Sequence, residues 1–368
     1  MAILLDSEDI EQILTPRLCL DALEAVFQDL SKGDAASMLG REVVLARAPD
    51  VDVPGARPGH VYHGLEVQSG TAPTIKTASL RVKSDMLFWP ETDQGFRRKK
   101  FPAAGDGLFC GFVILFDTDT GEPTAIMPDG LIQRMRVGAT AALGAKYLSR
   151  EESSVVCVIG AGFQAETQIM TLNEVRDLKE VRIYSPTPES RESLAERLDS
   201  TIDARVVAID SPEAAIKDSD IVHAATNSRA PVLSAEWLEE GMHVGVIGEQ
   251  EIGEDVLLVS DVLATSRPYS PRQSNTAFAN GFAEDVHEDE FRHGWWHNES
   301  YWTRMANLGD LIMGRSTGRQ NASDITTFIN KGAAVQFTAT GAALLEAAKA
   351  AGLGRDLPTE WLLQPYQP

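Results

Sequence analysis

The 368-residue chain is 43% hydrophobic and 24% charged, a composition typical of a globular protein of one large or two ordinary domains. Its formal net charge of −21 opposes binding to nucleic acid or to an anionic membrane, so an anionic ligand would need a local cluster of basic residues. Because no apolar run reaches the roughly 18 residues of a membrane span and the N-terminus lacks the pattern of a signal peptide, we expect a cytoplasmic protein.

The N-terminal half contains a helix signal and a hairpin signal. The threonine–proline pair at residues 15–16 is typical of a helix start, and this helix is predicted to run to about Lys32 and to end at Gly33. Residues 107–128, "GLFCGFVILFDTDTGEPTAIMP", hold two apolar runs around a turn rich in Asp, Thr, Gly and Pro, which predicts a β-hairpin. Asp129 then caps a predicted helix, "GLIQRMRVGATAALGAKYLSR", whose small residues indicate close packing on a neighbour.

From Ser153 onward strand-like and helix-like segments alternate. This rhythm is typical of a parallel sheet with crossover helices. The strand candidates are "SVVCVI" (154–159), "VRIYS" (181–185), "ARVVAI" (204–209), "IVHAAT" (221–226) and "HVGVIG" (243–248), with "VLLVSD" (256–261) as one more. Helical segments between them include "PESRESLAERL" and "SAEWLEE".

The glycine-rich turn after the first of these strands predicts a dinucleotide site. Gly160, Gly162 and Ala165 form the pattern G-x-G-x-x-A between a strand and a helix. The first glycine permits the tight turn, the second lets a pyrophosphate approach the backbone, and the small third residue lets the helix pack on the strand. Free N–H groups and the helix dipole then face the phosphates. The other residues expected to contact the cofactor from this and neighbouring turns are Phe163, Gln164, Thr226 and Gly248.

The end of the second strand bears on the choice between NAD and NADP. An acidic residue normally binds the ribose 2′-hydroxyl of NAD at this place, whereas this chain has a serine. The hydroxyl and basic side chains that would instead suit a 2′-phosphate are Ser185, Thr187, Ser190 and Arg191. In the alternative interpretation Thr187 only caps the next helix and Arg191 is a solvated helix residue. We expect NADP(H) as the favoured cofactor and NAD(H) as the alternative.

Several segments together resemble the ornithine cyclodeaminase/mu-crystallin family: "MRVGATAALGAKYLSR" directly ahead of "VVCVIGAGFQAETQ", then "GMHVGVIG" and "GRQNASDITTFINKG". Their order and spacing match the family from about Leu4 to Gly354. The resemblance implies an α/β fold with a Rossmann dinucleotide-binding domain at residues 138–329. It also implies an α+β substrate-binding and dimerisation domain built from residues 1–137 and 330–368, the N-terminal half and the C-terminal helix. Family members include cyclodeaminases, alanine and arginine dehydrogenases, ketimine reductases and an NADPH- and thyroid-hormone-binding crystallin, and they share hydride chemistry at the α-carbon of an amino or imino acid.

The resemblance also implies a set of basic residues that bind the substrate carboxylate: Arg41 in "MLGREVVL", Lys83 in "LRVKSDM" and Arg136 in "MRVGAT". Arginine suits a carboxylate because it donates two parallel hydrogen bonds, and a lysine beside the reacting nitrogen passes a proton. We expect Lys83 and Arg136 to be the catalytic residues, with Lys76 as the rival lysine; each could otherwise form only a surface ion pair. By the same resemblance, Phe328 and Asn330 lie near the nicotinamide.

The turn "GEQEIGED" departs from the cyclodeaminating relatives. These carry Asp two residues after the position of Gly248, where this chain has Gln250. Glutamine has no titratable proton, and the flanking Glu249 and Glu251 are expected to point elsewhere. We expect Gln250 to bind substrate without acting as a base, which disfavours cyclodeamination. Lys331 is a second departure, because members often have a small residue there.

The segment "HGWWHNESYW" has no role that the resemblance supplies. Its aromatic residues suit the core or a dimer interface better than a pocket for a bulky substrate, and they include Trp295, Trp296 and Trp302. His293 and His297 have the spacing of metal ligands on a helix, but no third ligand is apparent, so no metal is expected. The cysteines Cys19, Cys110 and Cys157 lie in apolar surroundings and are expected to be reduced core residues.

Together these observations favour an NAD(P)H-dependent imino-acid (ketimine) reductase or amino-acid dehydrogenase. Hydride transfer would occur at the α-carbon of a small amino or imino acid, with Lys83 passing a proton to the nitrogen while Arg136 and Arg41 hold the carboxylate. Ornithine cyclodeaminase is the second interpretation. A non-catalytic NADPH-binding protein of the crystallin kind is the third, and the presence of both Lys83 and Arg136 disfavours it. The expected assembly is a homodimer without nucleic-acid or membrane partners.

Overall fold

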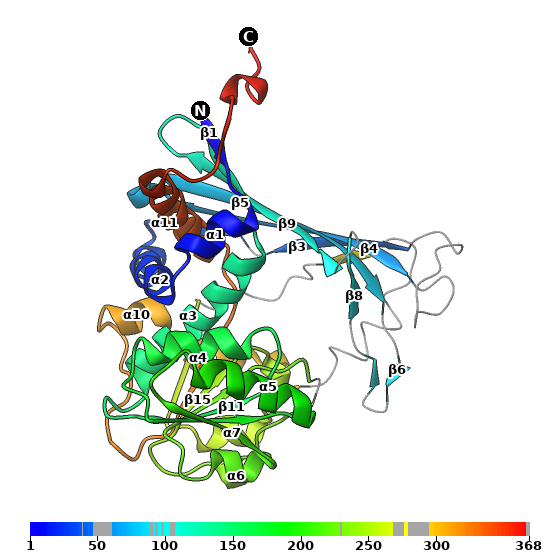
Figure 1. The fold of residues 1–368 in the computed structure, drawn as a ribbon. Helices are drawn as coiled ribbons and strands as arrows, with labels where there is room; N and C mark the ends of the chain where they lie inside the picture. Colours follow the sequence, from blue (N-terminus) through cyan, green and yellow to red (C-terminus); the bar gives the residue numbers. More distant parts are fainter. Residues whose placement is uncertain are drawn as a thin grey trace.

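The computed structural model describes residues 1–38, 40–46, 61–88, 91–92, 95–96, 99–103, 107–228, 230–267, 276–278 and 294–365. These residues form two large sheets, one in the upper half and one in the lower half of Figure 1, with helix α3 running between them.

The first sheet is mixed and combines the N-terminal half with strands from farther along the chain. Its order is β17-β3-β4-β5-β9-β10-β1-β20, with β2 beside β4 and β8 beside β5. The strands are β1 Ala2–Leu4, β2 Ala36–Ser37, β3 Arg41–Ala46, β4 Tyr62–Ala72, β5 Thr77–Phe88, β8 Lys99–Phe101, β9 Cys110–Asp117, β10 Pro123–Pro128, β17 Thr276–Phe278 and β20 Arg355–Leu357. A separate short pair is formed by β6 Glu91–Thr92 and β7 Gly95–Phe96. The antiparallel pair β9–β10 is the predicted hairpin.

The second sheet is parallel in every described pair, as the alternating sequence predicts. Its order is β13-β12-β11-β14-β15-β19-β16-β18. The strands are β11 Val155–Ile159, β12 Glu180–Tyr184, β13 Arg205–Ile209, β14 Ile221–Ala224, β15 His243–Val246, β16 Val262–Thr265, β18 Ala306–Asn307 and β19 Thr326–Ile329. The order reverses at β11, with β12 and β13 on one side and β14 and β15 on the other. This is the place where doubly wound sheets bind dinucleotides.

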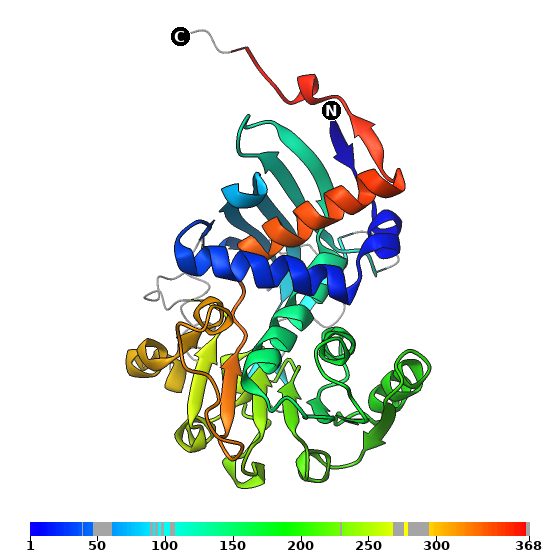
Figure 2. The same cartoon turned by 90° about the vertical axis from the view of Figure 1, so that its left-hand side faces the viewer.

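Helices cover both sheets, and none in the described ranges is long and apolar enough to cross a membrane. The α-helices are α1 Ser7–Ile13, α2 Pro16–Lys32, α3 Gly130–Leu148, α4 Ala165–Asn173, α5 Pro188–Asp199, α6 Pro212–Ile216, α7 Glu254–Val259, α9 Glu299–Arg304, α10 Leu308–Ile312 and α11 Val335–Ala351. Short 3-10 turns are η1 Pro73–Ile75, η3 Ala235–Trp237, η4 Glu249–Glu251, η5 Trp295–His297 and η6 Thr359–Trp361. Figure 2 shows α2 and α11 side by side across the first sheet.

Helix α2 begins and ends as the sequence predicts. The Thr15 hydroxyl accepts from the N–H of Leu18 at 3.1 Å, and Gly33 closes the helix in the left-handed region at φ 84°. Two other local predictions are wrong. Residues 256–259 form the end of helix α7 rather than a strand, and residues 260–261 follow the helix. Two buried residues are followed by two exposed ones, as in a helix, and a short apolar run alone does not distinguish a helix from a strand. Residues 234–240 form only the single turn η3.

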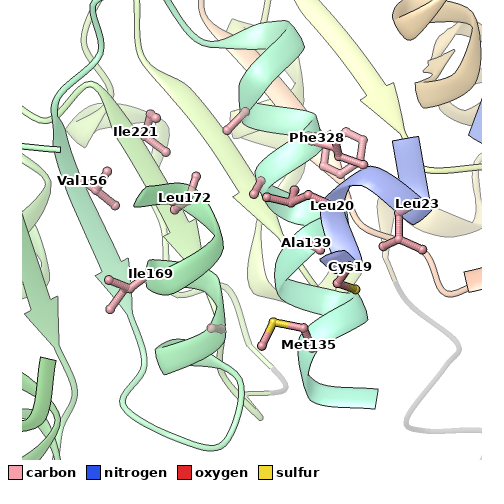
Figure 3. Close-up of a cluster of buried hydrophobic side chains, with 14 of the residues drawn as sticks. Cys19, Leu20, Leu23, Met135, Ala139, Val156, Ile169, Leu172, Ile221 and Phe328 are labelled. Atoms are coloured by element: carbon pink, nitrogen blue, oxygen red, sulfur yellow. The ribbon is translucent and has the colours of Figure 1, made fainter. Parts of the chain in front are cut away.

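Helix α3 joins the two halves and packs closely on both, as its small residues indicate. A Cβ on Gly138 would lie 2.6 Å from a backbone oxygen of α4, and a Cβ on Gly144 would lie 2.4 Å from the ring of Phe328 in β19. Figure 3 shows side chains of α2, α3, α4 and the parallel sheet meeting in one core. The predicted boundary between the two domains, at residues 137 and 138, falls inside this helix. Strand β17 belongs by sequence to the predicted Rossmann range 138–329, but it pairs with β3 in the first sheet.

Candidate active site

The turn after β11 has the geometry that the glycine pattern predicts. Gly160 has a φ of 119°, which L-residues rarely adopt, and a Cβ there would lie 2.4 Å from the carbonyl oxygen of Ala225. Its N–H donates to the Tyr184 carbonyl at 2.7 Å, which joins the turn to the end of β12. A Cβ on Gly162 would meet no described atom within 4 Å, so the backbone of the turn is open to a ligand.

A cavity of about 1180 Å³ lies over this turn and the ends of β12 and β14. The predicted cofactor residues that line it are Gly160, Gly162, Phe163, Gln164, Ser185, Thr187 and Thr226. The side-chain oxygen of Gln164 is buried there without a hydrogen-bond partner among the described residues. Because an unsatisfied buried acceptor is costly, a ligand that brings a hydroxyl or amide donor would be favoured. The open turn and this acceptor fit a nicotinamide dinucleotide.

The polar residues after β12 divide into two groups. Ser185 and Thr187 line the cavity, and Thr187 occupies the N-cap position of α5 without a side-chain capping bond. Arg191 has other partners: its guanidinium donates to the Ser185 carbonyl at 2.9 Å and pairs with the carboxylate of Asp210. Arg191 is also buried, so it is not the solvated helix residue of the alternative interpretation.

Glu251 joins the two turns that follow β14 and β15, and the sequence analysis assigned it no such role. One carboxylate oxygen accepts from the N–H and the hydroxyl of Thr226, at 2.6 and 2.7 Å. The other accepts from the N–H groups of Ile247 and Gly248, at 3.0 and 2.8 Å. Burial raises the pKa of Glu251 in spite of these bonds, which act in the opposite direction. The only sequence signal was an acidic residue inside a glycine-bounded turn at a sheet edge.

The other residues of this turn lie as follows. Gln250 folds back over Gly248, where an added Cβ would lie 2.6 Å from its amide nitrogen. Glu249 pairs with Lys331, whose ammonium also lies 5.5 Å from the ring centroid of Trp302. The two flanking acids are therefore engaged with other partners, in agreement with the expectation that they point elsewhere. The pairing also gives Lys331, the departure from the family pattern, a defined contact.

Lys83 lies in a group of charged side chains on one face of the first sheet. Its ammonium pairs with Glu66 on the opposite strand β4 and lies 3.3 Å from Asp85. Burial alone would raise the pKa of Glu66, but the charge of Lys83 and its hydrogen bond outweigh it and hold the pKa at about 2. The side chain of Lys83 is 16% exposed, whereas that of the rival Lys76 is 70% exposed and pairs with Asp119 at 2.6 Å on a surface turn. The geometry favours Lys83.

Arg136 is buried and held in one orientation by three neighbours. Its terminal nitrogens donate to the side-chain oxygens of Gln336, at 2.6 Å, and Gln133, at 2.7 Å, while the guanidinium carbon lies 5.0 Å from the ring centroid of Phe337. Its Nε has no partner among the described residues. Burial, and after it the charge of Arg81, lower the pKa of Arg136 to about 9. The positive charge of Arg136 is therefore not fully balanced by its described neighbours, and an anionic ligand would balance it.

A second buried ion pair, which the sequence analysis missed, lies on the same sheet face. Arg81 Nε donates to Asp129 at 2.6 Å, so the carboxylate of Asp129 does not cap helix α3 as predicted, although the residue occupies the N-cap position. The lack of a side chain at Gly111 leaves room for the Asp129 carboxylate, because a Cβ at position 111 would lie 2.2 Å from it. The available signal was a charged residue at every second position of β5, "RVKSD", since these positions share a face.

Helix α3 brings the charged group and the dinucleotide cavity together. Arg134 lies 5.2 Å from the ring centroid of Phe163, which lines the cavity, and pairs with Glu166 in the first turn of α4. Arg136, two residues farther along, lies on another side of the same helix and contacts Gln336 and Phe337 of α11. Asn330 donates to the carbonyl of Val137 at 2.9 Å, so the segment after β19 is fixed to this part of the helix.

The remaining predicted substrate and nicotinamide residues are Arg41, Phe328 and Asn330. The backbone of Arg41 pairs with Val67 of β4, but the side chain of Arg41 lies outside the described residues. Phe328 is fully buried against Gly144, and Asn330 is bonded to α3. Contact of these residues with a substrate or a nicotinamide ring stays a prediction.

The aromatic segment packs into the core of the parallel sheet. Trp295 and Trp302 are buried, and the indole N–H of Trp295 is shared between the carbonyls of Glu249 and Ile252, at 3.2 and 3.1 Å. These tryptophans therefore support the η4 turn. His293 lies outside the described residues. Cys19 and Cys157 are buried as predicted, but the prediction for Cys110 is wrong, because it is exposed at the start of an alternating strand.

The sequence pattern of the Ornithine cyclodeaminase/mu-crystallin family matches residues 100–352, and the chain belongs to this family. The alanine dehydrogenase of Archaeoglobus fulgidus is 26% identical over 362 residues, which cover 96% of this chain and 97% of that protein. The Delta(1)-pyrroline-2-carboxylate reductase of Bacillus cereus is 28% identical over 69% of this chain and 75% of that protein. Among solved structures, the fold is similar to Delta(1)-pyrroline-2-carboxylate reductase of Thermococcus litoralis in complex with NADH and L-proline, with a TM-score of 0.72 and 23% identity over 96% of this chain and all of that one.

Proposed function

We propose that the protein is an NAD(P)H-dependent reductase of imino acids, or in the opposite direction a dehydrogenase of amino acids. The class, a nicotinamide-dependent oxidoreductase acting on C=N or CH–NH2 bonds, is that of its named relatives. One observation carries the assignment: helix α3 bears both Arg136, which interacts electrostatically with Glu66 of the Lys83–Glu66 pair, and Arg134, which contacts Phe163 of the glycine turn. A bound nicotinamide ring would give hydride to the α-carbon in reduction and take it in oxidation.

Arg136 binds the substrate carboxylate in this proposal. Its Nε and the remaining N–H groups of its terminal nitrogens are available for hydrogen bonds, while Gln133 and Gln336 fix the plane of the guanidinium. A carboxylate also supplies the missing negative charge in a buried environment. This fixes the α-carbon relative to the cavity, which is the main requirement for transfer between two bound molecules.

Lys83 passes the proton to or from the substrate nitrogen, directly or through water. Glu66 and Asp85 hold its ammonium in place from two sides. The pKa of Glu66 at about 2 keeps that carboxylate ionised at neutral pH, so Glu66 serves as a fixed counter-charge. Gln250 supplies an amide that orients a bound group without exchanging a proton.

Two alternatives use the same fold. Ornithine cyclodeamination needs further proton transfers after hydride transfer, and Gln250 gives no titratable group for them. A non-catalytic NADPH-binding protein would not need both Lys83 and Arg136 in one group of charged side chains. For the cofactor we propose a preference for NADPH, because hydroxyl groups and no carboxylate line the cavity at the end of β12. For the assembly we propose a homodimer; Val43 and Leu65, opposite each other on β3 and β4, are exposed apolar residues on the first sheet.

The test is a turnover assay with NADPH and NADH against cyclic imino acids and against keto acids supplied with ammonia or methylamine. Oxidation of one cofactor per amino acid formed would support the proposal. Tight cofactor binding without turnover of any of these substrates would favour the binding protein instead.

A further inference from the structure

The ends of β12 and β13 bring together an ion pair beside the dinucleotide cavity. Tyr184 and Ile209 are neighbours in the parallel register, so the residues that follow them, Ser185 and Asp210, leave the sheet side by side. Arg191, in the first turns of α5, reaches both: one nitrogen donates to the Ser185 carbonyl at 2.9 Å, and another pairs with the Asp210 carboxylate.

This pair adjoins the part of the cavity where the 2′-position of the adenosine ribose is recognised in Rossmann folds. Ser185 and Ser190, close in sequence to Arg191, line the cavity, as does Pro212, two residues after Asp210. Arg191 is 7% exposed, and its Nε is buried without a partner among the described residues. The guanidinium therefore has a donor left for a ligand that displaces its present contacts.

The two partners of the pair differ strongly in exposure. The Arg191 side chain is 9% exposed, whereas that of Asp210 is 94% exposed. An ion pair whose acidic partner is fully hydrated is weak, because water competes for the carboxylate and salt screens it. A phosphate dianion that reached the same guanidinium would bind it more strongly, because it carries nearly two negative charges and offers three acceptor oxygens.

We propose that Asp210 sets the cofactor preference of this protein by holding Arg191 and competing for it with the 2′-phosphate of NADP(H). The proposal rests on the dinucleotide site of the proposed function. NADPH binding requires the guanidinium to exchange its bond to Asp210 for one to the phosphate, whereas NADH binding leaves the pair intact. Asp210 also adds a negative charge close to a charged ligand group. Both effects moderate the preference for NADPH.

The test compares Kd values for NADPH and NADH, measured by calorimetry and by the fluorescence of the bound nicotinamide. In Asp210→Asn the ratio of Kd(NADH) to Kd(NADPH) is expected to rise about 1.5- to fivefold, the range expected for loss of an exposed ionic interaction, and the rise should shrink at high salt. In Arg191→Leu the ratio is expected to fall below the wild-type value. Asp203→Asn is the matched control, because it removes the same charge from an exposed residue before the start of β13.

The outcomes separate the two levels of the argument. If wild-type protein binds neither cofactor, the proposed function and this inference both fail. If both cofactors bind but Asp210→Asn leaves their ratio unchanged, or changes it no more than Asp203→Asn does, Asp210 does not set the preference. Because Asp210 is exposed, its substitution leaves the fold intact, and the binding measurement reports on the proposal even if the buried Arg191→Leu variant does not fold.

Discussion

Glu251 accepts two hydrogen bonds from Thr226, at 2.6 and 2.7 Å, although the two residues follow different strands of the parallel sheet. With its second oxygen the same carboxylate holds the backbone at Gly248. Thr226 lines the dinucleotide cavity, and Gly248 begins the turn that carries Gln250. Glu251 is therefore a positioning residue that fixes the turn after β14 relative to the turn that carries Gln250.

Glu251→Gln is expected to weaken cofactor binding. The amide nitrogen of glutamine donates rather than accepts, so either the N–H of Thr226 or the N–H groups of Ile247 and Gly248 lose their acceptor. Each lost acceptor costs about 1–3 kcal/mol. We expect the KM for NADPH to rise at least about fivefold, while the KM for the imino acid changes little. Glu240→Gln on the exposed surface is the control. Equal changes in both KM values, or none, would contradict a role specific to the cofactor turn.

Lys83→Met is expected to lower kcat by about 10²- to 10⁴-fold, the usual cost of losing a positioned proton donor. Lys76→Met should retain activity, because that side chain pairs with Asp119 on the surface. Circular dichroism and thermal unfolding would confirm that both variants fold. Full activity of Lys83→Met together with a loss in Lys76→Met would reverse the assignment.

Arg136→Lys tests carboxylate recognition with the positive charge retained. Lysine has no planar pair of donors and cannot keep both glutamine contacts while binding a carboxylate. The KM for the imino acid is expected to rise by roughly 10- to 100-fold, in line with loss of a charged hydrogen bond, and cofactor Kd should be preserved. A variant with wild-type KM would show that the substrate carboxylate binds elsewhere.

The next prediction concerns Gln250 and the reaction with L-ornithine. Because glutamine cannot carry out the proton transfers that cyclodeamination needs after hydride transfer, a catalytic amount of NAD⁺ or NADP⁺ will not support formation of proline and ammonia. Wild-type protein is expected to give no proline, whereas its NAD(P)H oxidation by an imino acid remains stoichiometric. Gln250→Asp should add an ionisable group to the pH dependence of kcat. Many proline molecules per cofactor with the wild-type protein would restore the cyclodeaminase as the better assignment.

The protein contains two buried histidines, and because of them we expect its free energy of unfolding to fall in acid. His223 Nδ1 lies 2.7 Å from Gln168 Oε1, and His243 Nδ1 lies 2.9 Å from Thr326 Oγ1, both with fully buried rings. Burial lowers the pKa of His223 to about 3, and burial followed by the charge of His223 places the pKa of His243 well below its usual value.

Because the unfolded chain takes up these protons near pH 6.5 and the folded chain does not, stability should fall as pH drops from about 6.5 toward 3. Each histidine contributes a slope of up to about 1.4 kcal/mol per pH unit. Urea unfolding between pH 7 and 4 measures it. In His243→Asn the slope of unfolding free energy against pH should fall by the contribution of about one proton. An unchanged slope in the variant would mean that other groups cause the acid sensitivity.

The sequence predicted elements well where the signal was local. The cap at Thr15, the hairpin of β9 and β10, and the glycine turn each depend on residues close together in the chain. It failed at residues 256–261, where a short apolar run suits a strand and a helix equally. For the site it proposed Lys83 and Arg136, but it did not predict their partners Glu66 and Gln336, which lie on another strand and another helix.

The sequence by itself determined the parallel sheet, the open glycine turn after β11 and the presence of basic residues in a very acidic chain, because backbone sterics and hydrophobic periodicity act over a few residues. Only the tertiary structure decided which charges meet. Glu66 faces Lys83 through the register of β4 and β5, Arg191 turns to Asp210 through the register of β12 and β13, and Glu251 reaches Thr226 across the sheet edge. These pairs join residues 17 to 25 positions apart. Their formation depends on strand alignment, which is fixed by burial of the whole sheet rather than by any local pattern.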